Sequence, residues 1–183
     1  MASDARIRYT KMVIQQQFAG LLMELPLKRV TVKEICDRAE INRATFYRYY
    51  NDPYDLLDKM EEEFLADLME KWERSSPKGI KATFLVIMEK MKENIALYQA
   101  LFSENGDRQF LERLLILCYK ESAVSLHQQF EKLSFQEQEY LYYFLANGCS
   151  GILTQWVSGG METPINEVAD FAERLIGNTV KEL

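Results

Sequence analysis

The sequence predicts an all-α fold, and three observations support this prediction. Apolar residues recur along most of the 183 residues at the three- and four-residue spacing of amphipathic helices. The alternating runs of Val, Ile and Thr that indicate half-buried strands are absent. The chain has only four prolines and eight glycines, and each proline stands at an expected helix boundary. The pattern predicts nine helices and no sheet.

Three helices are expected within the first 52 residues. The first covers about residues 3–25 and ends before Pro26, because proline disfavours helical backbone in the residue before it. The second covers residues 32–39, with Thr31 as N-cap and Glu34 completing a capping box. The third covers residues 43–49 and has Asn42 as its N-cap. The inward apolar positions of the first helix are expected to be Ile7, Ile14, Phe18, Leu21, Leu22 and Leu25.

Six helices are expected in the remaining body of the chain. The fourth begins after the N-cap Asp52, has Pro53 as its first residue, and ends at residue 74 before Ser75, Ser76 and Pro77. The others are expected at residues 78–93, 96–102, 107–133 and 135–158, and from residues 163–164 onwards. Ser134 caps the eighth of these helices, and Gly159 and Gly160 end it.

Two short helices joined by a tight turn within residues 31–50 indicate a helix-turn-helix reader of duplex DNA. The N-terminal side chains of such a second helix lie against base edges in the major groove. Arg43 suits guanine O6 and N7, while Ala44 and Thr45 suit a thymine methyl or a base edge. Phe46 is expected to be the inward apolar anchor. Arg6, near the start of the first helix, is expected to reach the minor groove or a phosphate.

Residues 6–60 closely resemble the N-terminal signature of the TetR/AcrR family of transcriptional regulators. The matching segments are residues 31–36 (TVKEIC), 39–42 (AEIN), 45–50 (TFYRYY) and the capped helix that starts DPYDLL at residue 52. The resemblance implies three DNA-binding helices (residues 1–52) followed by a six-helix regulatory and dimerisation domain (residues 53–183). One such module reads only three or four bases, which is too few for a genome, so a homodimer on a roughly palindromic operator is expected. The stretch 142–176 more loosely resembles the C-terminal domain of one subgroup of the family.

The resemblance also implies roles for individual residues. Tyr47 and Tyr49 are expected to donate hydrogen bonds to backbone phosphates, as are Thr31 and Lys33 from the preceding helix. Tyr50 is expected in the core. Lys33 and Arg48 have an ordinary alternative as solvated charges. The complete set expected at DNA is Arg6, Thr31, Lys33, Asn42, Arg43, Ala44, Thr45, Tyr47, Arg48 and Tyr49.

The sequence departs from the family pattern at two positions. Glu40 stands where the family has glycine, at a turn that needs left-handed backbone, and a side chain there costs about 1 kcal/mol. Pro53 stands where the family often has a lysine that reaches a phosphate, and proline offers neither charge nor N–H.

The net charge of −6 is unevenly distributed. Residues 1–52 hold nine basic and six acidic residues, a net +3, whereas residues 53–183 hold 13 basic and 22 acidic residues, a net −9. An acidic body and a basic end favour approach to phosphate by that end. A +3 balance over 52 residues is also compatible with ordinary surface variation.

The body is expected to hold an effector pocket and a dimer interface. Apolar and aromatic side chains that line pockets also occur in ordinary cores, so the two interpretations stay open for each residue. The pocket candidates are Trp72, Phe84, Met88, Met91, Tyr98, Phe102, Tyr119, His127 and Tyr143. The candidates for a four-helix dimer interface are Leu145, Gly148, Ile152, Trp156, Phe171, Leu175 and Ile176.

Several classes of function find no support in the sequence. It has no apolar run of 18 residues and no signal segment, so a cytoplasmic protein is expected. Cys36, Cys118 and Cys149 read as buried thiols, and the single histidine makes neither a zinc site nor a catalytic triad. We expect no enzyme, no cofactor and no metal.

The leading hypothesis is therefore a homodimeric DNA-binding repressor that a small apolar or amphipathic effector releases from its operator. The alternative has the same DNA-binding end and a body that binds a protein partner, as in an activator. An exposed apolar patch over a filled core favours the alternative, and a large cavity favours the first.

Overall fold

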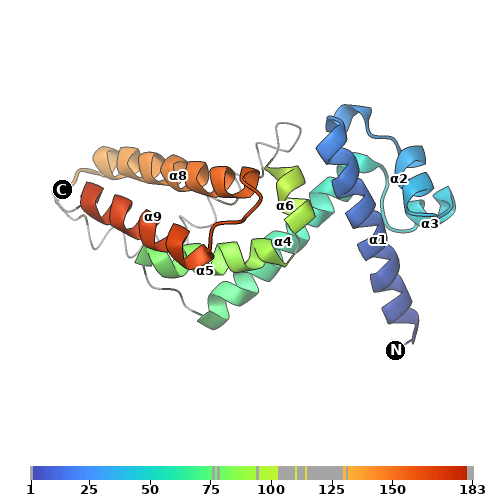
Figure 1. Ribbon diagram of the computed structural model, residues 1–183, viewed down its shortest axis with the longest axis horizontal. Helices are drawn as coiled ribbons and strands as arrows, with labels where there is room; N and C mark the ends of the chain where they lie inside the picture. Colours follow the sequence, from blue (N-terminus) through green and yellow to red (C-terminus); the bar gives the residue numbers. More distant parts are fainter. Residues whose placement is uncertain are drawn as a thin grey trace. The chain divides into compact units, whose positions relative to one another are not determined.

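The computed structural model describes residues 2–75, 77, 79–93, 95–102, 110, 114, 130 and 132–180, and within them it contains helices and no strand (Figure 1). This confirms the predicted all-α class. The predicted helix at residues 107–133 lies almost entirely outside the described residues. The helices are α1 (Ala2–Glu24), α2 (Val32–Arg38), α3 (Arg43–Tyr47), α4 (Pro53–Ser75), α5 (Gly79–Lys92), α6 (Ile95–Leu101), α8 (Phe135–Ser158) and α9 (Ile165–Val180), with a 3-10 turn η1 (Leu27–Arg29).

The chain forms two compact units. The first comprises Met1–Met69 and Asn94–Asp107, and the second comprises Glu70–Glu93 and Arg108–Leu183, so α4 contributes to both. In the first unit α6 packs against α1, and the Tyr98 ring of α6 lies 4.9 Å from the Phe64 ring of α4. The predicted division after residue 52 therefore falls inside the first unit, and it stays a prediction about function.

Local signals in the sequence set the helix ends of the first unit. The Glu34 amide donates to Thr31 Oγ1 and the Thr31 amide donates to Glu34 Oε2, which completes the predicted capping box. Asp52 Oδ1 accepts the amides of Tyr54 and Asp55 at 2.8 and 2.9 Å, which confirms its role as the cap of α4. Helix α3 ends at Tyr47, two residues earlier than predicted.

The turn between α2 and α3 has the left-handed residue that the sequence predicts. Glu40 has φ 53°, and the next amide, that of Ile41, donates to the Cys36 carbonyl at 3.1 Å. This bond ends α2 and turns the chain toward α3. Below the turn the core contains Phe18, Ile35 and Phe46, all buried. The expectation for Ile7 is wrong, because its side chain is exposed on the N-terminal part of α1.

In the second unit, α9 packs against both α5 and α8. The Lys81 ammonium of α5 pairs with the Asp170 carboxylate of α9. Ser134 caps α8, as predicted, and the structure shows that Glu137 completes a second capping box there. After Gly159 and Gly160, Met161 adopts φ 58°, and the Trp156 indole N–H donates to the Thr163 carbonyl at 2.8 Å. This hydrogen bond closes the turn that brings α9 beside α8.

Candidate nucleic-acid interface

Helix α3 presents one apolar anchor inward and most of its polar groups outward. Phe46 is fully buried, as is Ile35 on α2, the helix that α3 packs against. Arg43, Ala44, Tyr47 and Arg48 are exposed, and Thr45 and Tyr49 are half-buried. The exposed residues are the ones predicted to read or hold DNA, so this helix carries them on the side away from the core.

The cap of α3 decides which groups of Asn42 and Thr45 remain for DNA. Asn42 Oδ1 accepts both the Thr45 amide, at 2.8 Å, and the Thr45 hydroxyl, at 3.0 Å. The cap therefore occupies the Asn42 oxygen and the Thr45 proton. The Asn42 amide donors and the Thr45 methyl group are left to face a ligand.

At the start of α2, a side chain of the protein already occupies the groups that a phosphate would bind. The Thr31 hydroxyl donates to Glu34 Oε2 at 2.7 Å, and this bond, together with that of the Thr31 amide, lowers the pKa of the Glu34 carboxyl. A carboxylate thus already interacts with the positive end of this helix. The predicted phosphate contact of Thr31 requires its hydroxyl to turn away from Glu34, whereas Lys33 is exposed beside it.

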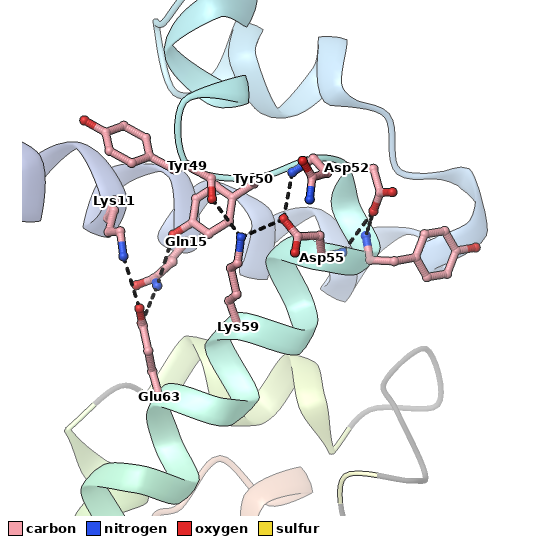
Figure 2. Close-up of polar contacts among 10 residues, drawn as sticks. Lys11, Gln15, Tyr49, Tyr50, Asp52, Asp55, Lys59 and Glu63 are labelled. Atoms are coloured by element: carbon pink, nitrogen blue, oxygen red, sulfur yellow. Dashed lines mark hydrogen bonds and ion pairs between the residues drawn. The ribbon is translucent and has the colours of Figure 1, made fainter.

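The start of α4 is also occupied by carboxylates (Figure 2). Asp52 accepts two amides of the first turn, and Asp55 Oδ2 accepts the Asn51 amide at 2.7 Å. That bond and the neighbouring Lys59 lower the pKa of the Asp55 carboxyl. Two negative side chains and a buried proline disfavour a phosphate at this end of α4. The family often has a phosphate-binding lysine where this chain has Pro53. The groups that cap α4, Asp52 and Asp55, are carboxylates and do not replace that lysine.

The predicted pocket residues separate between the two compact units. Trp72, Phe84, Met88 and Met91 are buried in the second unit, and Tyr98 and Phe102 are buried in the first. Burial fits both the pocket and the core interpretation. Tyr119 and His127 lie outside the described residues. Tyr143 does not fit an internal pocket, because 57% of it is exposed on α8.

The predicted dimer residues divide into an exposed group and a core group. Phe171 and Leu175 are about half exposed on α9. Gly148 on α8 faces open space, because a Cβ placed on it would have no neighbouring atom within 4 Å. Leu145 and Ile152 are half-buried. The expectation that Trp156 and Ile176 lie in a dimer interface is wrong. Only 5% of Trp156 and 6% of Ile176 is exposed, and both side chains belong to the core of the second unit.

Sequence reasoning missed other exposed apolar residues on α8. Tyr140 and Phe144 are both more than 60% exposed, and they lie four residues apart in line with Gly148. This spacing was readable in the sequence. The spacing alone does not show which face of α8 packs against the core, and this decides whether the apolar stripe is buried or exposed.

The part of the chain that the structure describes has neither a metal-binding group nor a membrane span. It contains no group of three His, Cys, Asp or Glu side chains placed to hold a metal ion. None of the described helices is long and apolar enough to cross a membrane. Cys36 is buried, and burial raises its thiol pKa.

Helices α1, α2 and α3, here called the head, contain a helix-turn-helix whose second helix, α3, exposes basic and aromatic side chains. Together with a body that is helical throughout its described elements, this head defines the class of helix-turn-helix regulators. A TetR family model described as the transcriptional regulator C-terminal region matches residues 79–178, more than half of the chain. The chain belongs to the TetR family of transcriptional regulators, whose members are regulators rather than enzymes.

One curated relative and three solved structures are similar to the chain. The HTH-type dhaKLM operon transcriptional activator DhaS of Lactococcus lactis is 28% identical over 93 residues, which is 51% of this chain and 49% of that protein. The match thus spans about half the length of that relative. A structure of a dihydroxyacetone kinase operon activator DhaS aligns with TM-score 0.63 and 22% identity over 95% of this chain and 97% of that one.

Two further structures share the fold. The fatty acid degradation regulator FadR from Bacillus halodurans aligns with TM-score 0.70 and 13% identity over 94% of this chain and 96% of its own. A TetR-like transcriptional regulator from Rhodococcus sp. RHA1 aligns with TM-score 0.68 and 15% identity over 94% of this chain and 97% of its own. At these identities the structures establish the fold alone.

Proposed function

We propose that this chain binds duplex DNA as a homodimer and regulates transcription from a roughly palindromic operator. One observation carries the proposal: α3 buries Phe46 and exposes Arg43, Ala44 and Tyr47 beside it. Arg43 suits a guanine edge in the major groove, and the Tyr47 hydroxyl suits a phosphate. Further phosphate or groove contacts come from Lys33, Arg48, Tyr49 and Arg6. Thr31 and Asn42 contact DNA with the groups that their capping hydrogen bonds leave available.

A dimer supplies the length of DNA that specific binding needs. One α3 reads three or four base pairs, whereas two copies about 34 Å apart enter successive major grooves and read two half-sites. The exposed stripe Tyr140, Phe144 and Gly148 on α8, with Phe171 and Leu175 on α9, supports pairing of these two helices with those of a second copy. An exposed apolar stripe of this kind is typical of an interface.

We place the regulatory input in the body and the protein in the cytoplasm. In the leading form, a small apolar or amphipathic effector binds within the second unit, among Trp72, Phe84, Met88 and Met91, and releases the operator. A coupling of about 1–2 kcal/mol changes DNA affinity roughly fivefold to thirtyfold. This form is a repressor.

A second form is an activator whose body binds a protein partner. The exposed aromatic residues of α8 favour it, among them Phe135, which is 76% exposed, and Tyr143. The curated relative carries the description of an activator. A reporter gene behind the selected operator distinguishes the two forms: expression rises on deletion of a repressor and falls on deletion of an activator.

Selection of bound duplexes from a random pool at about 150 mM salt tests the DNA-binding proposal. We expect a symmetric site with half-sites about 10 base pairs apart, centre to centre. Arg43→Ala is expected to lose base preference at one position of each half-site, whereas Tyr47→Phe weakens binding evenly across sequences. A pool without any enriched site refutes the proposal. Unchanged preferences with Arg43→Ala refute the assignment of base reading to that residue.

A further inference from the structure

A polar stripe on α4 joins this helix to α1 and to the chain just after the recognition helix. The stripe consists of Asp55, Lys59 and Glu63, which are four residues apart and therefore lie on one face of α4. Figure 2 shows the Lys59 side chain directed toward Tyr49 and Asp55, and the Glu63 side chain directed toward Lys11 and Gln15. All of these residues belong to the first compact unit.

Lys59 holds the backbone where the chain leaves α3. Its ammonium donates to the Tyr49 carbonyl at 3.0 Å and to Asp55 Oδ2 at 2.9 Å, and it lies 5.6 Å from the centre of the Tyr50 ring. Asp55 Oδ2 also accepts the Asn51 amide. One ammonium and one carboxylate thus close the turn that connects α3 to α4.

Glu63 ties the same face of α4 to α1. Its carboxylate accepts Gln15 Nε2 at 2.8 Å and Lys11 Nζ at 3.4 Å. Gln15 Nε2 also lies 3.5 Å from the hydroxyl of Tyr50, a residue that is otherwise buried against Phe46 of α3. Glu63 therefore connects α4 through α1 to the ring that supports the recognition helix.

Directional contacts of this kind constrain a helix differently from apolar packing. The hydrophobic effect is non-directional, whereas a hydrogen bond weakens steeply when its distance and angle change. Each pair here is partly exposed and weak by itself, but together they join α4 to α1 and to the turn after α3. A shift of α4 along or away from α1 breaks several of them together.

We propose that Lys59 and Glu63 are positioning residues through which α4 sets the orientation of α3 and of Tyr49 for DNA. Neither residue touches DNA itself. The proposal rests on the proposed DNA-binding function, and it assigns to this chain's own side chains the link between α4 and the reading helix.

The test measures the affinity of the full-length protein for the duplex that wild type selects. Glu63→Ala and the control Glu62→Ala each remove one negative charge from adjacent exposed positions of α4. Simple electrostatics predicts tighter binding to phosphate for both. Our proposal predicts roughly threefold weaker binding for Glu63→Ala alone, the change expected for loss of a partly exposed ion-pair network. Equal affinities of the two variants overturn it.

Lys59→Met distinguishes positioning from a direct phosphate contact. Loss of a phosphate contact reduces the slope of log affinity against log salt by about 0.9. We expect weaker binding with an unchanged slope, and restoration by Lys59→Arg, which keeps a donor and a charge. A slope reduced by about one makes Lys59 a phosphate ligand and overturns the positioning role.

Amide hydrogen exchange tests the same link without DNA. In Lys59→Met the amides of Tyr49, Tyr50 and Asn51 are expected to exchange several times faster, while the amides of α5 keep their wild-type rates. Unchanged exchange at residues 49–51 overturns the proposal. If wild type selects no duplex, the proposed function fails, and the exchange result alone decides the inference about Lys59.

Discussion

The left-handed residue between α2 and α3 offers a prediction whose sign follows from the backbone alone. Glu40 is exposed and has φ 53°, and no hydrogen bond or ion pair joins its side chain to other described residues. Its Cβ is therefore in the strained region without a compensating contact. Glu40→Gly is expected to stabilise the head.

The magnitude follows from two opposing effects. Left-handed backbone with a side chain costs roughly 1–2 kcal/mol, and glycine removes that strain. Glycine also enlarges the unfolded ensemble, which costs roughly 0.4–1 kcal/mol. The free energy of unfolding is therefore expected to rise by about 0.5–1 kcal/mol. The Cys36–Ile41 hydrogen bond that closes the turn uses backbone atoms only and survives the substitution.

Native-state hydrogen exchange of the α2 and α3 amides is the appropriate assay, because it reports the head separately from the second unit. These amides are expected to exchange roughly twofold to fivefold more slowly in Glu40→Gly, while Glu40→Ala stays near wild type. Met161 provides a contrast with the same backbone, φ 58°, but only 3% exposure. Met161→Gly loses buried side-chain contacts worth roughly 2–5 kcal/mol and must destabilise. A destabilised Glu40→Gly variant refutes the reasoning.

Three further predictions concern the cap, the dimer and the core tyrosine. Asn42→Ala is expected to lower the free energy of unfolding of the head by about 1 kcal/mol in urea titrations, while Asn42→Ser retains most of it. Phe171→Glu combined with Leu175→Glu is expected to give monomers in sedimentation at concentrations where wild type is dimeric, and a persistent dimer places the interface elsewhere. Burial, and then the charge of Glu63, raises the pKa of Tyr50 to about 12, above its value near 10 in an unfolded chain. The folded state thus holds this proton more tightly, so the stabilisation is complete below about pH 10 and is lost as pH rises toward 12. Urea midpoints are expected to fall over this interval, and less so in Tyr50→Phe.

Local chemistry made the helix ends and the turn after α2 predictable from the sequence. The caps at Thr31, Asn42 and Ser134 involve bonds to residues three positions away, so the sequence alone contains both partners. The left-handed conformation of Glu40 is local in the same sense. The all-α class follows because each helix carries its own apolar spacing.

Contacts between distant residues were not predictable in this way. The bonds of Glu63 to Lys11 and Gln15 join residues about fifty positions apart, and the helical pattern does not say which polar faces meet. The same limit explains Trp156 and Ile176, which periodicity placed in a dimer interface and the structure places in the core. An apolar stripe that is covered within the chain looks the same in sequence as one that is left exposed, such as Phe144 on α8.

The proposed function requires that two copies of α3 read two halves of one symmetric site. The most direct measurement compares wild-type affinity for the selected duplex with its affinity for the same duplex after one half-site has been scrambled, at fixed salt. We predict a loss of at least a hundredfold, since several mismatched base pairs at about 1–3 kcal/mol each remove one of the two reading contacts. Equal affinity for the two duplexes contradicts the reading of two half-sites by two copies of α3.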